Sequence, residues 1–114
     1  MKMQHVTIQT EAFEAEIAFY QKYVGLSIQR DMRPGRQMVF LADAAGDTQV
    51  EIIERSGAAD VGNENLSVGF HAEDLDGLHQ TFTDDGLNPT PFVAHDSIRF
   101  FFVKDPAGLT VQFI

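Results

Sequence analysis

The stretch FLADAAGDTQVEII (residues 40–53) returns in altered form at the end of the chain as FVKDPAGLTVQFI (residues 102–114). Each copy holds an apolar run, an Asp-x-Ala-Gly turn and a second run in which apolar and polar residues alternate. Alternation with a period of two is typical of a half-buried β-strand. The repeat therefore predicts the same strand-turn-strand unit twice, with Glu51 in the first copy at the position of Gln112 in the second.

The residues before the first copy extend this unit. Residues 4–9 alternate like a strand, and residues 10–25 place apolar side chains at helical spacing. Thr10 is the expected N-cap of that helix, and Gly25 suits its left-handed C-terminal position. Further strand patterns lie at 26–31, 36–42 and 48–54, so the first half predicts the order βαβββ; the helix face comprises Phe13, Ile17, Tyr20 and Val24.

The second half repeats this order after a small, polar linker at residues 55–65. A strand pattern is followed by a helix pattern with Leu75, Leu78 and Phe82 on one face, and three more strand patterns complete the set. We therefore expect one α+β domain over residues 1–114, with module one at 1–54 and module two at 66–114. The expected architecture is two βαβββ modules forming a curved, mostly antiparallel eight-stranded sheet around a cleft, with the helices outside.

The composition excludes several classes of function. A formal net charge of −9 argues against nucleic acid and against anionic membranes, because both require a basic surface. The chain has no Cys, which removes disulfides, thiolate nucleophiles and Cys-ligated zinc. No apolar run is long enough to span a bilayer, and residues 1–10 lack the pattern of a signal peptide. We therefore expect a cytoplasmic location.

Strand alternation predicts a polar face opposite the helices in each module, carrying His5 and Glu51 in the first and Ser67 and Gln112 in the second. A sheet with one solvated face would explain this pattern. However, the runs MVFLA (38–42) and IRFFFV (98–103) are apolar on both faces, so the second face requires cover from the other module or from a second subunit. This pattern predicts a small-molecule cleft and a homodimer.

The two modules are marked, in order, by the motifs HVTIQ, FYQKYVGL, VEII, FHAEDLD and FFVKDPAGLTVQF. In this order they resemble, over essentially the whole chain, the vicinal oxygen chelate superfamily of glyoxalase I, bleomycin-resistance proteins and extradiol dioxygenases. The resemblance implies a divalent metal held by the first and last strands of each module. Those positions fall on His5, Glu51, Ser67 and Gln112, where a complete glyoxalase-like set would read His, Glu, His, Glu.

Only His5 and Glu51 of this implied set are strong metal ligands. Ser67 is a weak neutral ligand and Gln112 offers one uncharged carbonyl, so zinc or nickel should bind poorly. The resemblance also assigns the proton-transferring carboxylate of glyoxalase-type enzymes to the position of Gln112, and an amide cannot act as a general base.

Three further residues are candidates for ligand binding. His71 shares a strand face with Ser67 and is either a substitute ligand or a partly exposed histidine. Arg99, with Phe101 in the aromatic run beside it, could clamp an anionic ligand, although an exposed arginine paired with the acidic surface explains it equally well, and strand parity leaves its face open. His79 and His95 are expected to be solvated.

Three functions follow from these residues. The leading one is a small-molecule-binding protein without a cofactor, its ligand contacted by Ser67, His71, Arg99, Phe101 and Gln112. The second is a divalent-metal-dependent lyase or isomerase resembling glyoxalase I (lactoylglutathione lyase), with zinc or nickel held by His5 and Glu51. The third is a non-catalytic regulatory module whose cleft is incidental.

Overall fold

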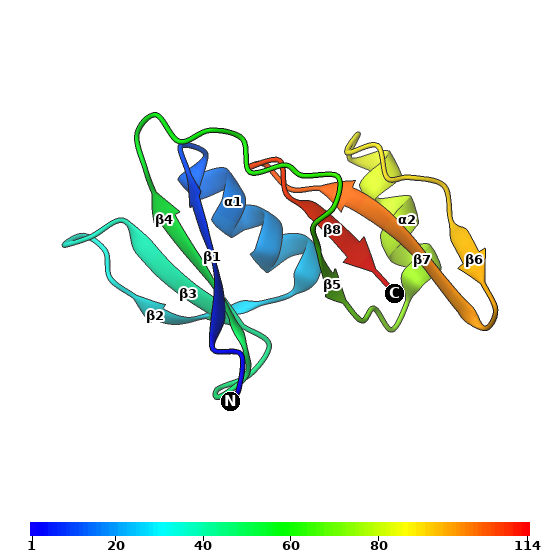
Figure 1. Ribbon diagram of the computed structural model, residues 1–114, viewed down its shortest axis with the longest axis horizontal. Coiled ribbons are helices and arrows are strands. Elements are labelled where there is room, and N and C mark those ends of the chain that lie inside the picture. Colours follow the sequence, from blue (N-terminus) through cyan, green and yellow to red (C-terminus); the bar gives the residue numbers. More distant parts are fainter. The chain divides into compact units, whose positions relative to one another are not determined.

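The computed structural model describes residues 1–114, which form two compact units, Met1–Val61 and Gly62–Ile114. Each unit contains one βαβββ module (Figure 1). The first consists of β1 (His5–Thr10), α1 (Phe13–Phe19), η1 (Tyr20–Val24), β2 (Ser27–Asp31), β3 (Met38–Ala42) and β4 (Gln49–Glu54). The second consists of β5 (Ser67–Phe70), α2 (Leu75–Asp84), β6 (Val93–His95), β7 (Ile98–Lys104) and β8 (Thr110–Phe113).

The two units have the same sheet topology. The strand orders are β1-β4-β3-β2 and β5-β8-β7-β6, and in each the first strand runs parallel to the last while the remaining pairs are antiparallel. The predicted α+β fold of two βαβββ modules is confirmed. The strands hydrogen-bond as two mixed sheets of four instead of one sheet of eight, since each sheet ends at its own edge strands.

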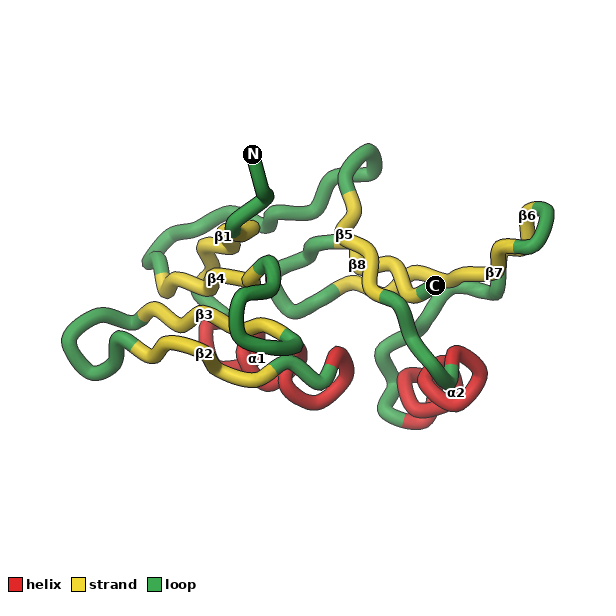
Figure 2. Tube along the Cα trace, turned by 90° about the horizontal axis from the view of Figure 1, so that it is seen from below, coloured by secondary structure: helices red, strands yellow, loops and turns green.

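In the first unit the helix packs on one face of the sheet (Figure 2). Phe13, Ile17 and Tyr20 are buried as their spacing predicts, whereas Val24 is only half-buried. The reason is that residues Tyr20–Val24 form a π-helical turn, which has more residues per turn than an α-helix and so rotates the last residues out of the α-helical register. Gly25 ends this turn at φ +76°, as expected for a left-handed cap.

The start of α1 differs from the prediction by two residues. The N-cap is Ala12, whose side chain cannot accept a hydrogen bond, and the Thr10 hydroxyl instead accepts one from the Ala12 N–H (3.0 Å). Thr10 therefore stabilises the turn that leads from β1 into the helix. Residue-type preferences identified the correct capping chemistry but not its position, because helix boundaries depend on local backbone geometry.

The core of the second unit is a cluster of phenylalanines beneath α2. Phe82 and Phe101 are fully buried and Phe113 nearly so, with the Phe113 ring centroid 5.3 Å from that of Phe82 and 5.5 Å from that of Phe101. Asp74 caps α2 by accepting a hydrogen bond from the Gly77 N–H (3.0 Å). Neither α1 nor α2 is long and apolar enough to cross a lipid bilayer.

The predicted DPAG turn joins β7 to β8. The Asp105 carboxylate is buried, and its Oδ1 accepts hydrogen bonds from the Ala107 N–H (3.0 Å) and the Leu109 N–H (2.9 Å). Gly108 adopts φ +93°, a conformation that a side chain would disfavour. The turn thereby sets the register that brings β8 back along β7.

The alternation along β7 can be tested by comparing two phenylalanines. Phe101→Ala removes a ring with no exposed surface and should lower the free energy of unfolding by about 3–5 kcal/mol. Phe100→Ala, on the opposite face and half-exposed, should cost roughly half of that or less, because less buried area is lost. Urea unfolding followed by circular dichroism measures both, and equal losses would contradict this assignment of faces.

Candidate functional site

The open face of the first sheet, the face opposite α1, carries a row of three paired residues. Thr7 of β1 lies beside Glu51 of β4, and Glu51 lies beside Phe40 of β3. Directly paired residues point to the same face of a sheet, so their side chains are neighbours. His5 joins this row from one end, because it lies two residues before Thr7 on the same strand.

Glu51 is the centre of this row. Its side chain is only 11 % exposed, and its Oε1 accepts a hydrogen bond from the Thr7 hydroxyl (2.5 Å). The His5 Nε2 lies 3.7 Å from the same oxygen, and the His5 ring packs edge-on against Phe40 with centroids 6.2 Å apart. The structure thus brings together His5 and Glu51, the two strong ligands of the implied metal site, and adds Thr7, which strand spacing alone did not single out.

The donors around Glu51 do not fit a tightly held transition metal. Zinc or nickel sites usually take three or more strong protein ligands, and no group of three or more His, Asp or Glu side chains is placed to hold a metal ion. In addition, the Glu51 Oε1 is already engaged by the Thr7 hydroxyl. His5 and Glu51 thus provide two strong ligands and Thr7 one neutral hydroxyl, which is fewer strong ligands than such a site usually takes.

The second unit repeats this row with different side chains. Gly69 of β5 pairs with Gln112 of β8, and Gln112 pairs with Phe102 of β7, just as Thr7, Glu51 and Phe40 pair in the first unit. The alignment of Gln112 with Glu51 is therefore confirmed by backbone register.

The space at Gly69 is used by the Gln112 amide. A Cβ at residue 69 would lie 3.3 Å from the Gln112 Oε1, so glycine leaves room for this side chain. Ser67, two residues before Gly69 on the same face, is exposed. The second row therefore presents an amide, a hydroxyl and an aromatic ring, with no carboxylate.

The structure separates Arg99 and Phe101 from this open face. Phe101 is fully buried against the Phe82 ring of α2, which leaves it no surface for a ligand. Arg99 lies on the same side of β7 and donates to both carboxylate oxygens of Asp76 on α2, at 2.8 and 2.9 Å. The strand carries Phe100 and Phe102 on its open face instead, because alternate residues point in opposite directions.

Arg99 also belongs to a stack of flat side chains that sequence reasoning did not anticipate. Its guanidinium lies 4.4 Å from the centre of the Phe92 ring, and Phe92 in turn stacks on His79 with centroids 4.5 Å apart. The His79 Nε2 lies 2.9 Å from the Thr90 carbonyl oxygen. His79 is thus half-buried and packed, contrary to the expectation that it is solvated, because the segment after α2 folds back over the helix.

The other two histidines are solvent-accessible. His71 follows the last residue of β5 and is exposed, and no ion pair or ring contact joins it to the residues of the open face. His95 is exposed, as expected, and is the last residue of β6, with its Nε2 3.8 Å from the Asp96 carboxylate. The structure therefore does not gather His71 with the other candidates.

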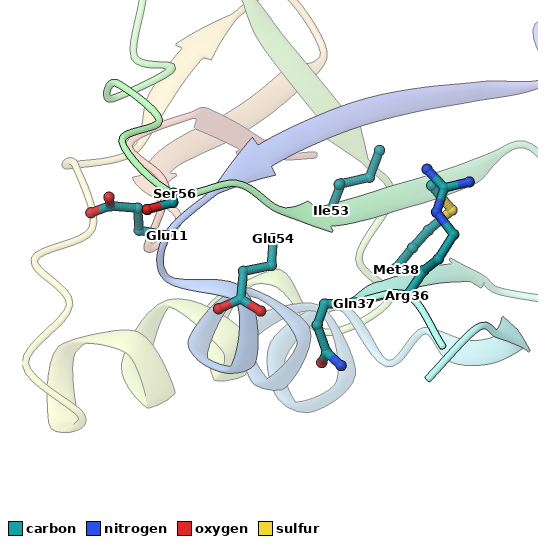
Figure 3. A pocket seen from close by; sticks show the side chains of 7 residues that line it. All are labelled: Glu11, Arg36, Gln37, Met38, Ile53, Glu54 and Ser56. Atoms are coloured by element: carbon teal, nitrogen blue, oxygen red, sulfur yellow. The ribbon is translucent and has the colours of Figure 1, made fainter. Parts of the chain in front are cut away.

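A cavity is present in each unit. The cavity of the first unit measures about 610 Å³ and is bordered by charged and polar side chains at the ends of β3 and β4 (Figure 3). Its lining residues are Glu11, Arg36, Gln37, Met38, Ile53, Glu54 and Ser56. None of the residues predicted from sequence to form the site lines this cavity.

The cavity of the second unit is more apolar and measures about 650 Å³. It contains Ser67, one of the predicted ligand-binding residues. The remaining lining residues are Glu64, Asn65, Leu66, Leu87, Asn88, Thr90, Phe102, Val103, Lys104 and Thr110. Sequence reasoning did not predict these residues, because they come from residues 64–66, from the segment after α2 and from the strands β7 and β8, which only the fold brings together.

Comparison with known proteins identifies the family. The sequence profile of the Glyoxalase/Bleomycin resistance protein/Dioxygenase superfamily matches residues 2–113. The chain belongs to this superfamily. A search of curated proteins found no match.

Solved structures of this superfamily's fold resemble the chain along its whole length. A "possible Glyoxalase" from Bacillus cereus has a TM-score of 0.81 at 21% identity, covering 100% of this chain and 98% of that one. The trypanothione-dependent glyoxalase I of Leishmania major gives 0.77 at 20% identity, covering 100% and 86%. An antibiotic binding protein from Streptomyces sp. CB03234 gives 0.76 at 16% identity, covering 99% and 93%. At these identities the likeness establishes the fold alone.

The pairing of Arg99 with Asp76 predicts a specific titration. Hydrogen bonds from Arg99 lower the pKa of the Asp76 carboxyl, and hydrogen bonds from Arg33 lower the pKa of Asp31 to about 2. Arg99→Gln should return the pKa of Asp76 toward its ordinary value of 3.8 and leave Asp31 unchanged, whereas Arg33→Gln should do the reverse. Carboxyl NMR shifts recorded against pH measure both values.

The sign of the effect on stability follows from these shifts. A carboxyl whose pKa is lower in the folded chain stabilises the fold above the unfolded pKa, and this contribution is lost as the pH falls through the folded value. For Asp31 the window therefore runs from about pH 4 down to about pH 2. An Asp76 pKa that does not move in Arg99→Gln would contradict the pairing of Arg99 with α2.

Proposed function

We propose that residues 1–114 act as one glyoxalase/bleomycin-resistance-like domain that binds a small molecule without a complete metal site and without chemistry. The observation that carries this proposal is the pair of rows on the open faces. The first row ties its one carboxylate, Glu51, to the Thr7 hydroxyl, and the second row has the neutral Gln112 at the equivalent place.

The side chain of Gln112 argues against glyoxalase-type proton transfer. A general base must accept a proton from the substrate, and a carboxamide does so far too weakly at neutral pH. Gln112 can instead donate one hydrogen bond and accept another, which suits recognition of a ligand. Its position beside Phe102, on the same face of the sheet, places an aromatic surface next to this polar group.

The size of the second unit's cavity also supports binding. Small-molecule pockets commonly enclose about 300–1,000 Å³, and this cavity has about 650 Å³ with Leu66, Leu87 and Phe102 in its lining. The Streptomyces protein of the same fold is described as antibiotic binding, which is a precedent for this architecture holding a ligand. Ser67 lines this cavity, whereas Gln112 lies next to it as the strand partner of Phe102; both are ligand-contacting residues of this proposal, and His71 is a further candidate outside the lining.

The alternative function is a divalent-metal-dependent lyase or isomerase similar to glyoxalase I. The feature that favours it is the His5–Glu51 pair, which keeps two of the four ligands implied by the family at a separation of 3.7 Å. A zinc or nickel ion, if bound, would polarise substrate oxygens. A regulatory module without any ligand is the third candidate.

Metal and ligand measurements distinguish these functions. We expect thermal unfolding to shift upward by several degrees with one or more planar, amphipathic compounds from a screening panel, and this shift should persist in EDTA, because binding to the native state raises its stability. Zinc and nickel titrations by calorimetry should give at most weak binding, reduced by His5→Ala and unchanged by the control His95→Ala.

Other outcomes identify the alternatives. Stoichiometric, tight metal that is lost in His5→Ala, together with turnover of a glutathione hemithioacetal, would replace the binding function by the lyase. The absence of any stabilising compound across the panel would instead favour the regulatory module.

The partner we propose is a second copy of this chain, in the cytoplasm. The support is the half-exposed aromatic rings on the open faces, Phe40 in the first unit and Phe100 and Phe102 in the second, which would bury further apolar area in a homodimer. Sedimentation at micromolar concentration should give twice 12.7 kDa. A monomer that persists to hundreds of micromolar would contradict the homodimer.

A further inference from the structure

The cavity of the second unit has an apolar wall that is unusually accessible. Leu66 is 58% exposed, and it lines this cavity together with Leu87 and Phe102, which are half-buried. Leu66 directly precedes β5, Leu87 lies in the segment after α2, and Phe102 is in β7. Ligands that contain rings usually bind against accessible apolar surface of this kind inside a pocket.

The wall formed by Phe102 is held in place by hydrogen bonds. The Phe102 N–H donates to the Thr90 hydroxyl oxygen (2.9 Å), and the Phe102 carbonyl accepts from the Thr90 N–H (2.9 Å). The segment around Thr90 is further fixed to α2, since the His79 Nε2 lies 2.9 Å from the Thr90 carbonyl oxygen. These hydrogen bonds hold the backbone at Phe102 in place, and its half-buried ring lines the cavity.

Beside this wall lies the one cation of the second unit that has no partner. Residues 62–114 contain two basic side chains, Arg99 and Lys104, and Arg99 is committed to Asp76. Lys104 is exposed, lines the cavity and forms no ion pair, not even with Glu64 on the same cavity. It lies two residues from Phe102 on β7, so the two side chains share a face about 7 Å apart.

Two hydroxyls complete a polar row next to this lysine. Ser67 of β5 pairs with Thr110 of β8, and Thr110 pairs with Lys104 of β7. The three side chains therefore point to the same face and all line the cavity. An ammonium flanked by hydroxyl groups is a donor set for a carboxylate or a sulfonate, with the charge-assisted bond from Lys104 as its strongest member.

From this arrangement we propose that the second unit's cavity binds an aromatic acid. The ring would lie against Leu66, Leu87 and Phe102, and the acidic group would accept hydrogen bonds from Lys104, Ser67 and Thr110. This inference rests on the proposed small-molecule function and specifies its ligand class. The overall charge of −9 opposes an anion only weakly, because charges beyond about 8 Å are screened at physiological salt, whereas Glu64 on the cavity rim opposes it locally.

Two probes that differ in charge test the proposal. 1-Anilinonaphthalene-8-sulfonate has an aromatic ring system and an acidic group, whereas N-phenyl-1-naphthylamine has the same rings without it, and both report binding by fluorescence. The wild-type protein should bind the sulfonate more tightly than the neutral probe. Lys104→Gln should raise the dissociation constant of the sulfonate probe by about fivefold or more. It should leave the dissociation constant of the neutral probe within about twofold of the wild-type value.

Matched variants show whether a charge affects probe binding through its position at the cavity or through the net charge of the protein. Glu64→Gln should increase the affinity for the sulfonate probe, because it removes a carboxylate that repels the probe's acidic group. This variant provides a second test if Lys104→Gln folds poorly. Lys22→Gln and Glu73→Gln make the same charge changes at residues that do not line the cavity and should leave the binding of both probes unchanged. Leu66→Ser should weaken both probes, which locates them in this cavity. Circular dichroism verifies that each variant is folded.

The probe experiments can contradict the aromatic-acid proposal without contradicting the proposed small-molecule function. Equal binding of both probes, unaffected by Lys104→Gln and Glu64→Gln, would overturn the aromatic-acid proposal while small-molecule binding stands. Binding of neither probe, or binding unaffected by Leu66→Ser, would overturn this cavity as the site. The compound panel then decides separately whether the protein binds a small molecule elsewhere.

Discussion

The parallel pairing of the first strand with the last strand in each unit is the constraint on which the rest of the structure depends. In the first unit β1 pairs with β4, and in the second β5 pairs with β8. This pairing closes each four-stranded sheet with β1 or β5 at one edge, and it brings Thr7 beside Glu51 and Gly69 beside Gln112. Residues more than forty positions apart in sequence thereby become neighbours on one face.

Because Glu51 and Gln112 have equivalent strand partners in the two units, the difference at this position is one of side-chain chemistry. Glu51 is nearly buried and receives a hydrogen bond from Thr7, while Gln112 extends over the space left by Gly69. A charged group needs such a hydrogen-bonding partner when it is removed from water, whereas a neutral amide tolerates a position beside glycine and an aromatic ring. The repeat thus retains one acidic position and has an amide in its counterpart, which suits binding better than proton transfer.

The basic residues of this acidic chain are mostly engaged within the fold, and the exceptions are informative. Arg99 is held by Asp76 and covers Phe92, so it contributes to the packing of α2 against β7. Lys104, five residues later on the same strand, has no such partner and lies on the opposite face beside Phe102 and the hydroxyls of Ser67 and Thr110. Strand β7 therefore carries Arg99, which is ion-paired with α2, on one face and Lys104, which has no ion pair and lines the cavity, on the other.

The sequence by itself determined the βαβββ repeat, the burial of Phe13, Ile17, Tyr20 and Phe82 on the helices, the turns and the correspondence of Glu51 with Gln112, because these depend on short-range periodicity and on residue types at fixed spacings. Only the tertiary structure decided which face of β7 carries Arg99, since alternation defines two faces without saying which one α2 covers. It also decided that Thr7 binds Glu51 and that Leu66, Leu87 and Lys104 share a cavity. These contacts join segments far apart in the chain, and their existence depends on strand register and packing, which no local pattern encodes.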